Sequence, residues 1–322
     1  MTNPSLTFPL STFSRARVDR LRIRHLRLLE LIAKTGSLTA AGAALNISQP
    51  AATKILQELE LAFGCTLLDR TSRGSVLSGF GERAMERLRI ILGLLDAAED
   101  EFANMAEAPF VRIGALRLAG ISLIPGLVAA LRSSGKLPRI RLYKGSVSVL
   151  SQMLNDGAVD CIIGRLDVAE IGDNIDDFDI TPLTDEHYQV ACSPTHPLAG
   201  KSKVGLPALL DFPWVTPFQS SYTRRTFETA FLGRGIPPPA AHIESASFHD
   251  SVAIVARTDF LTLAPRSAIA YYTELGRVQK LNLVDPFPVD YVVLIALKSV
   301  ATMASMKLIK SVLLRQVAGA RD

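Results

Sequence analysis

The chain of 322 residues is poor in cysteine and has no long apolar run. Cys65, Cys161 and Cys192 lie far apart and form no CxxC pair. They therefore indicate buried thiols in a reducing cytoplasm rather than a disulfide framework or a metal site. No apolar run reaches the ~18 residues that a membrane span needs. The first twenty residues carry arginines but no apolar export signal, so we expect a cytoplasmic protein.

The motifs of several enzyme classes are also missing. The chain has no GxSxG, HExxH, GxxxxGK[ST] or GxGxxG, so hydrolase, metalloprotease and nucleotide-binding functions have no motif behind them. His187, His196 and His249 have no zinc spacing, and we interpret them as structural or surface residues. We expect neither an enzyme, nor a metal, nor a bound cofactor.

Charge is weak overall but unevenly distributed. The net charge is +4; residues 1–90 hold 13 Lys and Arg against 7 Asp and Glu, whereas residues 91–322 hold 22 against 24. The imbalance fits either an ordinary solvated surface or a segment that faces a polyanion. Charge alone does not distinguish a solvated surface from a polyanion-binding segment, so the sequence pattern inside the basic segment has to decide between them.

Two short helices are predicted early in the basic segment. Apolar residues three and four apart predict a helix over 22–34, which ends at Gly36. A second helix over 37–46 is capped by Ser37 and is rich in alanine, which lets another helix cross it closely. Gly42 costs this helix about 1 kcal/mol relative to alanine.

A third helix is predicted over 48–64, with Ser48 as the N-cap, Pro50 in its first turn and Gly64 at its end. Two helices joined by a short turn are helix-turn-helix geometry, although an ordinary helical hairpin with a polar outer face gives the same pattern. The buried residues are predicted to be Ile55, Leu59 and Phe63. The exposed residues, whose side chains can contact bases or phosphates, are predicted to be Gln49, Thr53, Lys54 and Gln57.

The runs 67–70 and 74–78 predict a β-hairpin with Arg70 and Arg73 at its tip. A cationic hairpin beside a helix-turn-helix is typical of a wing, which places arginine against phosphates or in a minor groove. Two arginines in a turn, taken alone, are usually only solvated.

This segment resembles the DNA-binding head of LysR-type transcriptional regulators. The residues that carry the resemblance are Leu38, Thr39, Ala41, Leu45, Ser48-Gln49-Pro50-Ala51, Leu59-Glu60, Gly64, Leu67-Leu68-Asp69-Arg70 and Arg73-Gly74. Leu68, Asp69 and Gly42 depart from the usual Phe, Glu and better helix former. The resemblance implies that Gln49, Pro50, Thr53 and Lys54 meet the major groove and that Arg73 makes the wing contact. We assign DNA binding to Thr39, Ser48, Gln49, Pro50, Thr53, Lys54, Gln57, Arg70 and Arg73.

A long helix is predicted from residue 78 to about 105, followed by a hinge over 106–109. Its apolar positions follow a heptad-like spacing, which favours pairing with a second copy. A long helix packed on its own domain is the alternative. The predicted dimerisation seam is Met85, Leu88, Leu92, Leu95 and Phe102. The resemblance also implies dimers that pair into tetramers.

The remaining two thirds alternate apolar strands with helices, which predicts a mainly parallel sheet covered on both faces. Two similar α/β lobes are predicted, the first over about 109–185 and 288–322 and the second over about 186–287. The LysR family has such a sensor, which resembles periplasmic solute-binding proteins. Here the likeness rests on Gly114-Ala115-Leu116, Leu123-Ile124-Pro125, Asp160 with Ile163-Gly164-Arg165-Leu166, and His196-Pro197-Leu198. These features also resemble those of regulators that respond to sugars or aromatic acids.

Serines mark the places where strands give way to helices, namely Ser122, Ser146, Ser220-Ser221 and Ser245/Ser247. Each serine fits an N-cap, but their recurrence beside Arg117 and Arg165 predicts a pocket for a small polar or anionic molecule. Leu118 stands where the family often has Ser or Thr, so either Ser122 compensates or the pocket is more apolar than usual. The predicted effector-binding residues are Arg117, Leu118, Ser122, Arg165, Gln219, Ser220, Ser221 and Ser247.

The sequence thus predicts an α/β protein with a winged-helix head: a flexible extension over 1–20, a winged helix-turn-helix over 21–78, a linker helix over 79–108 and an effector-binding domain over 109–322. The predicted function is sequence-specific transcriptional regulation controlled by a small effector, such as a sugar or an aromatic or other organic acid. Promoter DNA, a second copy of the chain and RNA polymerase are the predicted partners. Two alternatives are a solute-binding protein with an unrelated helical head and an α/β enzyme.

Overall fold

The computed structural model describes residues 13–71, 74–103, 110–165 and 175–319. The chain forms two compact units, one of residues 1–107 with 152–158 and the other of residues 108–151 with 159–322. None of the helices in the described segments combines the length and the apolar character that a bilayer crossing requires. The predicted hinge over 106–109 lies outside the described residues.

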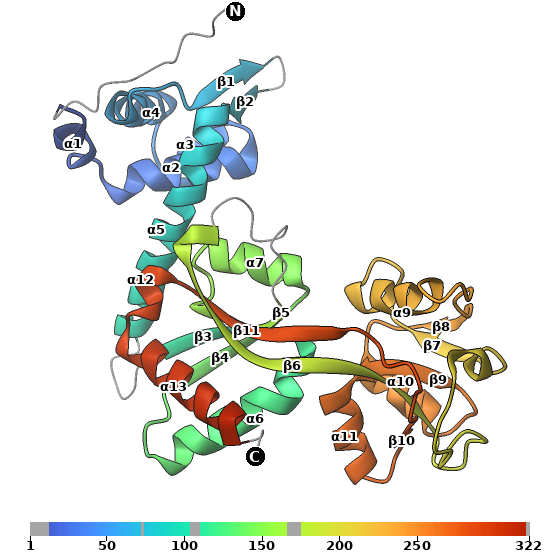
Figure 1. Cartoon of the computed structure of the whole chain (residues 1–322). Coiled ribbons are helices and arrows are strands. Elements are labelled where there is room, and N and C mark those ends of the chain that lie inside the picture. Colours follow the sequence, from blue (N-terminus) through green and yellow to red (C-terminus); the bar gives the residue numbers. More distant parts are fainter. Residues whose placement is uncertain (1–12, 72–73, 104–109, 166–174, 320–322) are drawn as a thin grey trace, which may run out of the picture. The chain divides into compact units, whose positions relative to one another are not determined.

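The first unit is a set of helices with one β-hairpin (Figure 1). Its elements are α1 (Phe13–Val18), α2 (Ile23–Thr35), α3 (Leu38–Ala44), α4 (Gln49–Phe63), β1 (Leu68–Thr71), β2 (Gly74–Leu77) and α5 (Gly79–Ala103). The three predicted helices and the hairpin are therefore confirmed. The prediction of a flexible extension over 1–20 is wrong for its last residues, because α1 forms there and contacts α4; residues 1–12 lie outside the described segments.

One apolar core joins α2, α4 and the first half of α5. Because the apolar residues of each helix recur at spacings of three and four, each helix turns one stripe inward. The buried side chains are Leu28, Leu29 and Ile32 from α2, Ala52, Ile55 and Leu59 from α4, and Met85, Leu88 and Leu92 from α5. The first half of α5 is therefore part of the core of the first unit.

The second unit is built on one mixed sheet with helices around it (Figure 1). Its strands are β3 (Phe110–Ala115), β4 (Arg139–Lys144), β5 (Cys161–Arg165), β6 (Phe178–Cys192), β7 (Trp214–Thr216), β8 (Ala241–Glu244), β9 (Leu261–Pro265), β10 (Gln279–Lys280) and β11 (Val289–Leu297). Its α-helices are α6 (Arg117–Ser133), α7 (Val147–Asn155), α9 (Tyr222–Leu232), α10 (Phe248–Val255), α11 (Arg266–Glu274), α12 (Lys298–Ala301) and α13 (Ala304–Gly319), and short 3-10 turns lie at Ile175–Asp177 and Leu206–Leu209.

The strand order β4-β3-β5-β11-β6-β9-β7-β8 divides the described sheet into two lobes. In the first lobe β3 pairs in parallel with β4 and β5, and in the second lobe β7 pairs in parallel with β8 and β9. The strands β3, β4, β7, β8 and β9 are each followed by a helix, as in βαβ units. The predicted strand–helix alternation is confirmed, but the prediction of a mainly parallel sheet is wrong, because β6 and β11 pair antiparallel with each other and with their other neighbours.

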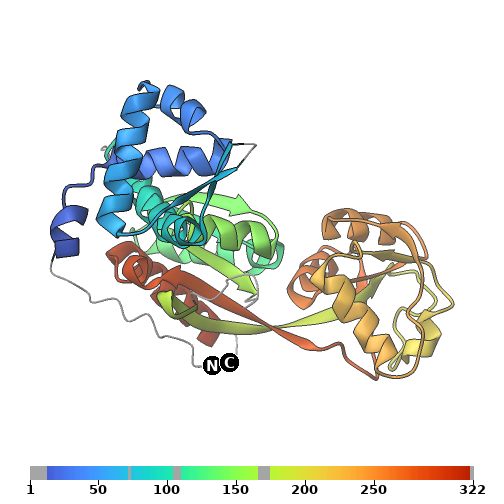
Figure 2. The same cartoon turned by 90° about the horizontal axis from the view of Figure 1, so that it is seen from above.

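The long strand β6 runs from the first lobe into the second, and the antiparallel strand β11 pairs with its first part (Figure 2). The first part of β6 pairs with β11 and its second part pairs with β9. The sequence predicts a lobe boundary between residues 185 and 186, and that position lies inside the continuous strand β6. The two lobes are therefore linked by paired strands rather than by a loop at this point.

Helix α6 begins earlier than the sequence predicts. Pro125 favours a helix that starts near Ser122, because proline fits best in a first turn. The structure begins the helix at Arg117, with Leu116 as the N-cap, and places Pro125 inside it. The prediction that Ser122 marks a strand-to-helix junction is therefore wrong.

Candidate functional site

The turn between α3 and α4 has the geometry of a helix-turn-helix. The hydroxyl oxygen of Ser37 accepts a hydrogen bond from the Ala40 N–H at 3.2 Å and caps α3. Asn46 adopts a left-handed φ of 54°, which reverses the chain after α3. Ser48 is the extended N-cap residue of α4, but its side chain makes no capping hydrogen bond. The start of α4 thus depends on backbone geometry and on Pro50 in its first turn.

Gly42 allows α3 and α4 to pack closely. A Cβ at this buried position would lie 3.2 Å from the Ala52 Cβ and 3.4 Å from the Ile47 carbonyl oxygen. The contact with Ala52 is tighter than an ordinary van der Waals contact, so a side chain here would force α4 to shift slightly away from α3. The cost of Gly42 in helix propensity is thus offset by the close crossing that it permits.

One side of α4 is turned to solvent. Gln49, Pro50, Lys54 and Gln57 are exposed, and Thr53 is half-exposed with its hydroxyl donating to the Gln49 carbonyl at 3.0 Å. Thr39 on α3 and the N-cap residue Ser48 are exposed as well. The members on α4 lie three and four residues apart and therefore share one accessible side of this helix, which we call the α4 face.

Polar contacts fix the orientation of α4 within the unit. The buried His25 ring places Nε2 3.0 Å from Glu58 Oε2, and this hydrogen bond lowers the pKa of the Glu58 carboxyl. Farther along α4, Glu60 Oε1 accepts a hydrogen bond from the Leu67 N–H at 2.8 Å, just before the hairpin. The helix is thus tied to α2 on one side and to the hairpin on the other.

The β1–β2 hairpin lies against the turn between α2 and α3. Leu68 pairs with Leu77 and Thr71 with Gly74, and the Ser75 N–H donates to the Gly36 carbonyl at 3.0 Å. The predicted wing is present. The side chain of Arg70 and all of Arg73 lie outside the described residues.

The dimerisation seam predicted on α5 needs correction. Met85, Leu88 and Leu92 are at most 5% exposed and pack in the core of their own unit, so they are not available to a partner. Leu95 and Phe102 are exposed. The alternative prediction, a helix packed on its own domain, is therefore right for the first half of α5.

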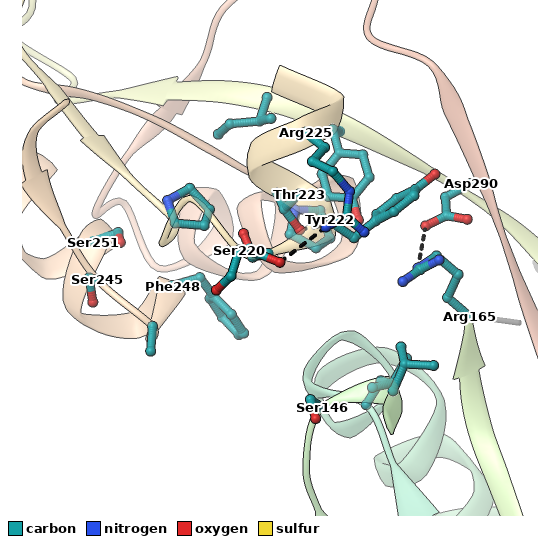
Figure 3. A pocket seen from close by; sticks show the side chains of 18 of the residues that line it. Ser146, Arg165, Ser220, Tyr222, Thr223, Arg225, Ser245, Phe248, Ser251 and Asp290 are labelled. Carbon is teal, nitrogen blue, oxygen red and sulfur yellow. Dashed lines mark hydrogen bonds and ion pairs between the residues drawn. The ribbon is translucent and has the colours of Figure 1, made fainter. Parts of the chain in front are cut away.

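The second unit contains a cavity of about 300 Å³ where its parallel strands end (Figure 3). The lining comes from the ends of β3 and β5, from the junctions β4–α7, β7–α9 and β8–α10, and from β6, β9 and β11. This is the place where α/β sheets bind ligands. The volume is at the lower end of the range for small-molecule pockets, so it suits a small metabolite.

Among the described residues, three charged side chains line this cavity. The Arg165 guanidinium carbon lies 3.6 Å from the centroid of the Tyr222 ring, and Arg165 Nε lies 3.6 Å from Asp290 Oδ2. Arg225 donates to the Ser220 carbonyl at 3.1 Å. The cavity therefore holds two cationic groups and one carboxylate, next to an aromatic ring.

Burial changes the acid–base behaviour of the lining. Asp290 is 8% exposed, and burial raises the pKa of its carboxyl even though Arg165 acts in the opposite direction. Burial also raises the pKa of Tyr188 to about 12, and the Tyr188 hydroxyl oxygen accepts a hydrogen bond from Thr223. Tyr188 thus stays neutral near neutral pH and offers hydrogen bonding rather than charge.

The predicted effector-binding residues lie in several places. Arg165, Ser220 and Ser221 line the cavity. Gln219 is exposed and Ser247 caps α10 by accepting from the Asp250 N–H, and neither is among the described lining residues; Ser122 lies within α6, also away from the cavity wall. The side chains of Arg117 and Leu118 lie outside the described residues. The described residues contain no group of three or more His, Cys, Asp or Glu side chains arranged to hold a metal ion.

Comparison with known proteins assigns the family. Residues 23–82 match the model of the bacterial regulatory helix-turn-helix protein, lysR family. Residues 107–316 match the model of the LysR substrate binding domain. The chain belongs to the LysR family of transcriptional regulators. Both alternatives, a solute-binding protein with an unrelated head and an enzyme, are thereby excluded.

Curated relatives agree with the family models. The regulator is 31% identical to the transcriptional regulator GbpR of Azospirillum brasilense over 277 residues, which are 84% of this chain and 78% of GbpR. It is 26% identical to PcaQ of Agrobacterium fabrum over 254 residues, 78% of this chain and 81% of PcaQ. A solved full-length OxyR variant from Pseudomonas aeruginosa has the same fold, with a TM-score of 0.61 at 20% identity, over 91% of this chain and 95% of OxyR.

Sequence reasoning missed several lining residues of this LysR-type regulator. Tyr222, Arg225, Phe248 and Asp290 line the cavity but carry no local motif. Tyr222 and Phe248 directly follow serines that the sequence did mark, and Arg225 lies four residues after Ser221, so a search one turn into each helix would have found them. Asp290 opens the last strand, and no signal in the sequence connects it to Arg165.

Proposed function

We propose that this LysR-type regulator binds promoter DNA through the α4 face and the wing, in the bacterial cytoplasm, and acts on RNA polymerase at that promoter. The exposed amides, hydroxyl and ammonium of the α4 face supply both hydrogen-bond donors and acceptors for base edges. The Arg70 and Arg73 guanidinium groups are assigned to the DNA on the wing side. Mapping of bound DNA across the genome would identify the operator, and Lys54→Ala is expected to weaken operator binding. Lys34→Ala on α2, which pairs with Glu30, is the matched control.

We further propose that the cavity binds a small organic acid that carries at least one hydroxyl group. The observation that carries this proposal is the mixed charge of the lining. The acid group would pair with the guanidinium of Arg225 or Arg165. Asp290 Oδ2 is buried without a hydrogen-bond partner among the described atoms, although Arg165 Nε lies 3.6 Å away. A buried acceptor of this kind favours a ligand that donates a hydroxyl hydrogen to it.

Calorimetric titration with matched pairs of acids, each pair differing by one hydroxyl, tests the ligand class. Arg225→Ala is expected to weaken binding of every acid, because a charge-assisted hydrogen bond is lost. Asp290→Asn is expected to reduce the preference for the hydroxylated member of each pair. Arg257→Ala, an exposed arginine on another part of the unit, is the matched control. Equal binding of both members of every pair to the wild-type protein would contradict the proposal.

We propose a homodimer that forms through an exposed apolar stripe of α5, with dimers pairing into tetramers. Phe80, Ile91, Leu95 and Phe102 are exposed and repeat at multiples of about three and a half residues, so they share one side of the helix. Two heads joined in this way would read a palindromic site with half-sites one helical turn apart. Sedimentation equilibrium over a concentration series tests the dimer and the tetramer.

Effector binding would change the closure of the two lobes and with it the spacing of the heads on DNA. Protection footprints on the operator, with and without the effector, test this mechanism. A different pattern of protected positions is expected in the two states. Identical footprints at saturating effector would contradict the switching mechanism and leave the DNA-binding proposal intact.

A further inference from the structure

The segment before the helix-turn-helix is strongly basic and has no part in the function described so far. Residues 13–24 contain five arginines and one aspartate. The match to the helix-turn-helix family model begins only at residue 23. We call residues 13–22 the N-terminal arm. It includes α1 and the turn that joins α1 to α2.

The N-terminal arm is anchored to the first unit. The Leu21 N–H donates to the Val18 carbonyl at 3.0 Å, and the Leu21 side chain packs against the core of the unit. At the end of the arm, the Arg22 N–H donates to Nδ1 of His25 at 3.0 Å, and the same ring contacts Glu58 on α4. The arm is thus held in place next to α4.

The charges of the arm are available to a partner. Arg17, Arg20 and Arg22 are exposed. Among the described carboxylates, none forms an ion pair with Arg17 or Arg20. Arg22 and Lys54 both lower the pKa of Glu58, which shows that the positive charge of the arm and that of the α4 face lie around the same carboxylate.

The position of α1 matches the path of a DNA backbone. In the view of Figure 1, α1 and the β1–β2 hairpin lie on either side of α4, and α1 contacts α4. Helices in contact have axes about 8 to 10 Å apart. The major groove is about 12 Å wide, so its phosphate walls run about 6 Å from a helix at its centre. The spacing of packed helices is thus compatible with a position of α1 over a groove wall, where arginine can meet phosphate.

We propose that the N-terminal arm is a second DNA-contacting surface, in which Arg17 and Arg20 bind backbone phosphates beside the groove that α4 enters. The proposal rests on the α4 face being the DNA-reading surface. We assign a duplex backbone as the partner because the exposed side chains of the arm are cationic and α1 contacts the DNA-reading helix α4. Such contacts are independent of sequence and raise affinity on every duplex.

Binding of the full-length protein to a fluorescent duplex of arbitrary sequence, titrated between about 50 and 200 mM salt, tests the proposal. The double variant Arg17→Ala/Arg20→Ala is expected to reduce the slope of log K against log salt by about 2. If the salt effect vanishes near 1 M, this slope change corresponds to roughly 30- to 45-fold weaker binding at about 0.15 M. Arg17→Lys/Arg20→Lys, which keeps the charge, is expected to restore most of the affinity and the slope.

The control variant is Arg257→Ala/Arg277→Ala, which removes the same charge from exposed positions of the second unit. Equal slopes for wild-type and Arg17→Ala/Arg20→Ala protein would overturn the proposal, as would a lysine variant that binds as weakly as the alanine variant. Tighter binding by the alanine variant would also overturn it and would assign an inhibitory role to the arm. If wild-type protein bound no duplex at the lowest salt, the DNA-reading function itself would fail.

Discussion

Truncation of Phe102 is expected to weaken the dimer without unfolding the protomer. Phe102 is 69% exposed in the single chain. Full burial of a phenylalanine side chain contributes about 3 kcal/mol, so covering the exposed part contributes about 2 kcal/mol per protomer. By two-fold symmetry, Phe102→Ala then costs about 3 to 4 kcal/mol per dimer, which raises the dimer Kd by two to three powers of ten.

Leu92→Ala provides the matched contrast. Leu92 is 2% exposed in the core of the first unit, and such truncations cost about 2 to 5 kcal/mol of unfolding free energy. For a unit of this size, that lowers the melting temperature by roughly 10 to 20 °C. Trp214 is the single tryptophan and is fully buried in the second lobe, so its fluorescence transition is expected to stay unchanged.

Analytical ultracentrifugation and scanning calorimetry of the full-length variants together show which side of α5 forms the dimer interface and which side packs in the core of the protomer. Phe102→Ala should raise the dimer Kd. The melting temperature of the first unit, extrapolated to protein concentrations at which the chain is monomeric, should stay unchanged. It would be refuted if Leu92→Ala weakened the dimer and left that unit fully stable, since Leu92 would then face the partner.

Three further outcomes are expected from single changes. Gly42→Val should lower the melting temperature of the first unit and weaken operator binding together, because the added atoms meet Ala52; circular dichroism melts measure the former and fluorescence anisotropy the latter. Asp290 has a raised pKa in the folded state, so its contribution to stability falls as the pH rises above its unfolded pKa; relative to Asp290→Asn, wild-type protein should lose stability from about pH 4 upward in thermal melts at stepped pH. A thiol reagent should label the half-buried Cys65 before Cys192, whose pKa burial raises to about 11, and mass spectrometry of partly labelled native protein would detect the reverse order.

The first unit could be predicted in detail because its signals are short-range. Gly36 and Gly64 end helices in the left-handed conformation that glycine adopts most easily, and Ser37 caps a helix within three residues. Each of these signals depends on neighbours along the chain. The order of the three helices and the hairpin then follows from the sequence, and the exposed side of α4 follows from its periodicity.

The position of the effector cavity could be predicted from the sequence, but its charged lining residues could not all be identified. Its position follows from the strand–helix alternation, since the carboxyl ends of parallel strands meet at one edge of the sheet. Its charged residues come from elements far apart in the chain, and the contact between Arg165 and Asp290 depends on the pairing of β5 with the late strand β11. Antiparallel pairing between distant strands leaves no periodic trace in the sequence, so this contact could only be seen in the structure.

Helix α5 shows why periodicity alone could not assign an interface. Leu88 and Leu92 lie four residues apart and face the core, while Ile91 and Leu95 lie four residues apart and face solvent. At 100° per residue these two stripes are about 60° apart on the helix, so a single heptad pattern covers both. The spacing shows which apolar residues are neighbours on the helix, but it does not show that one of the two stripes is already buried in the core of the same protomer. The residues left exposed after folding are therefore the ones that a second copy can bury.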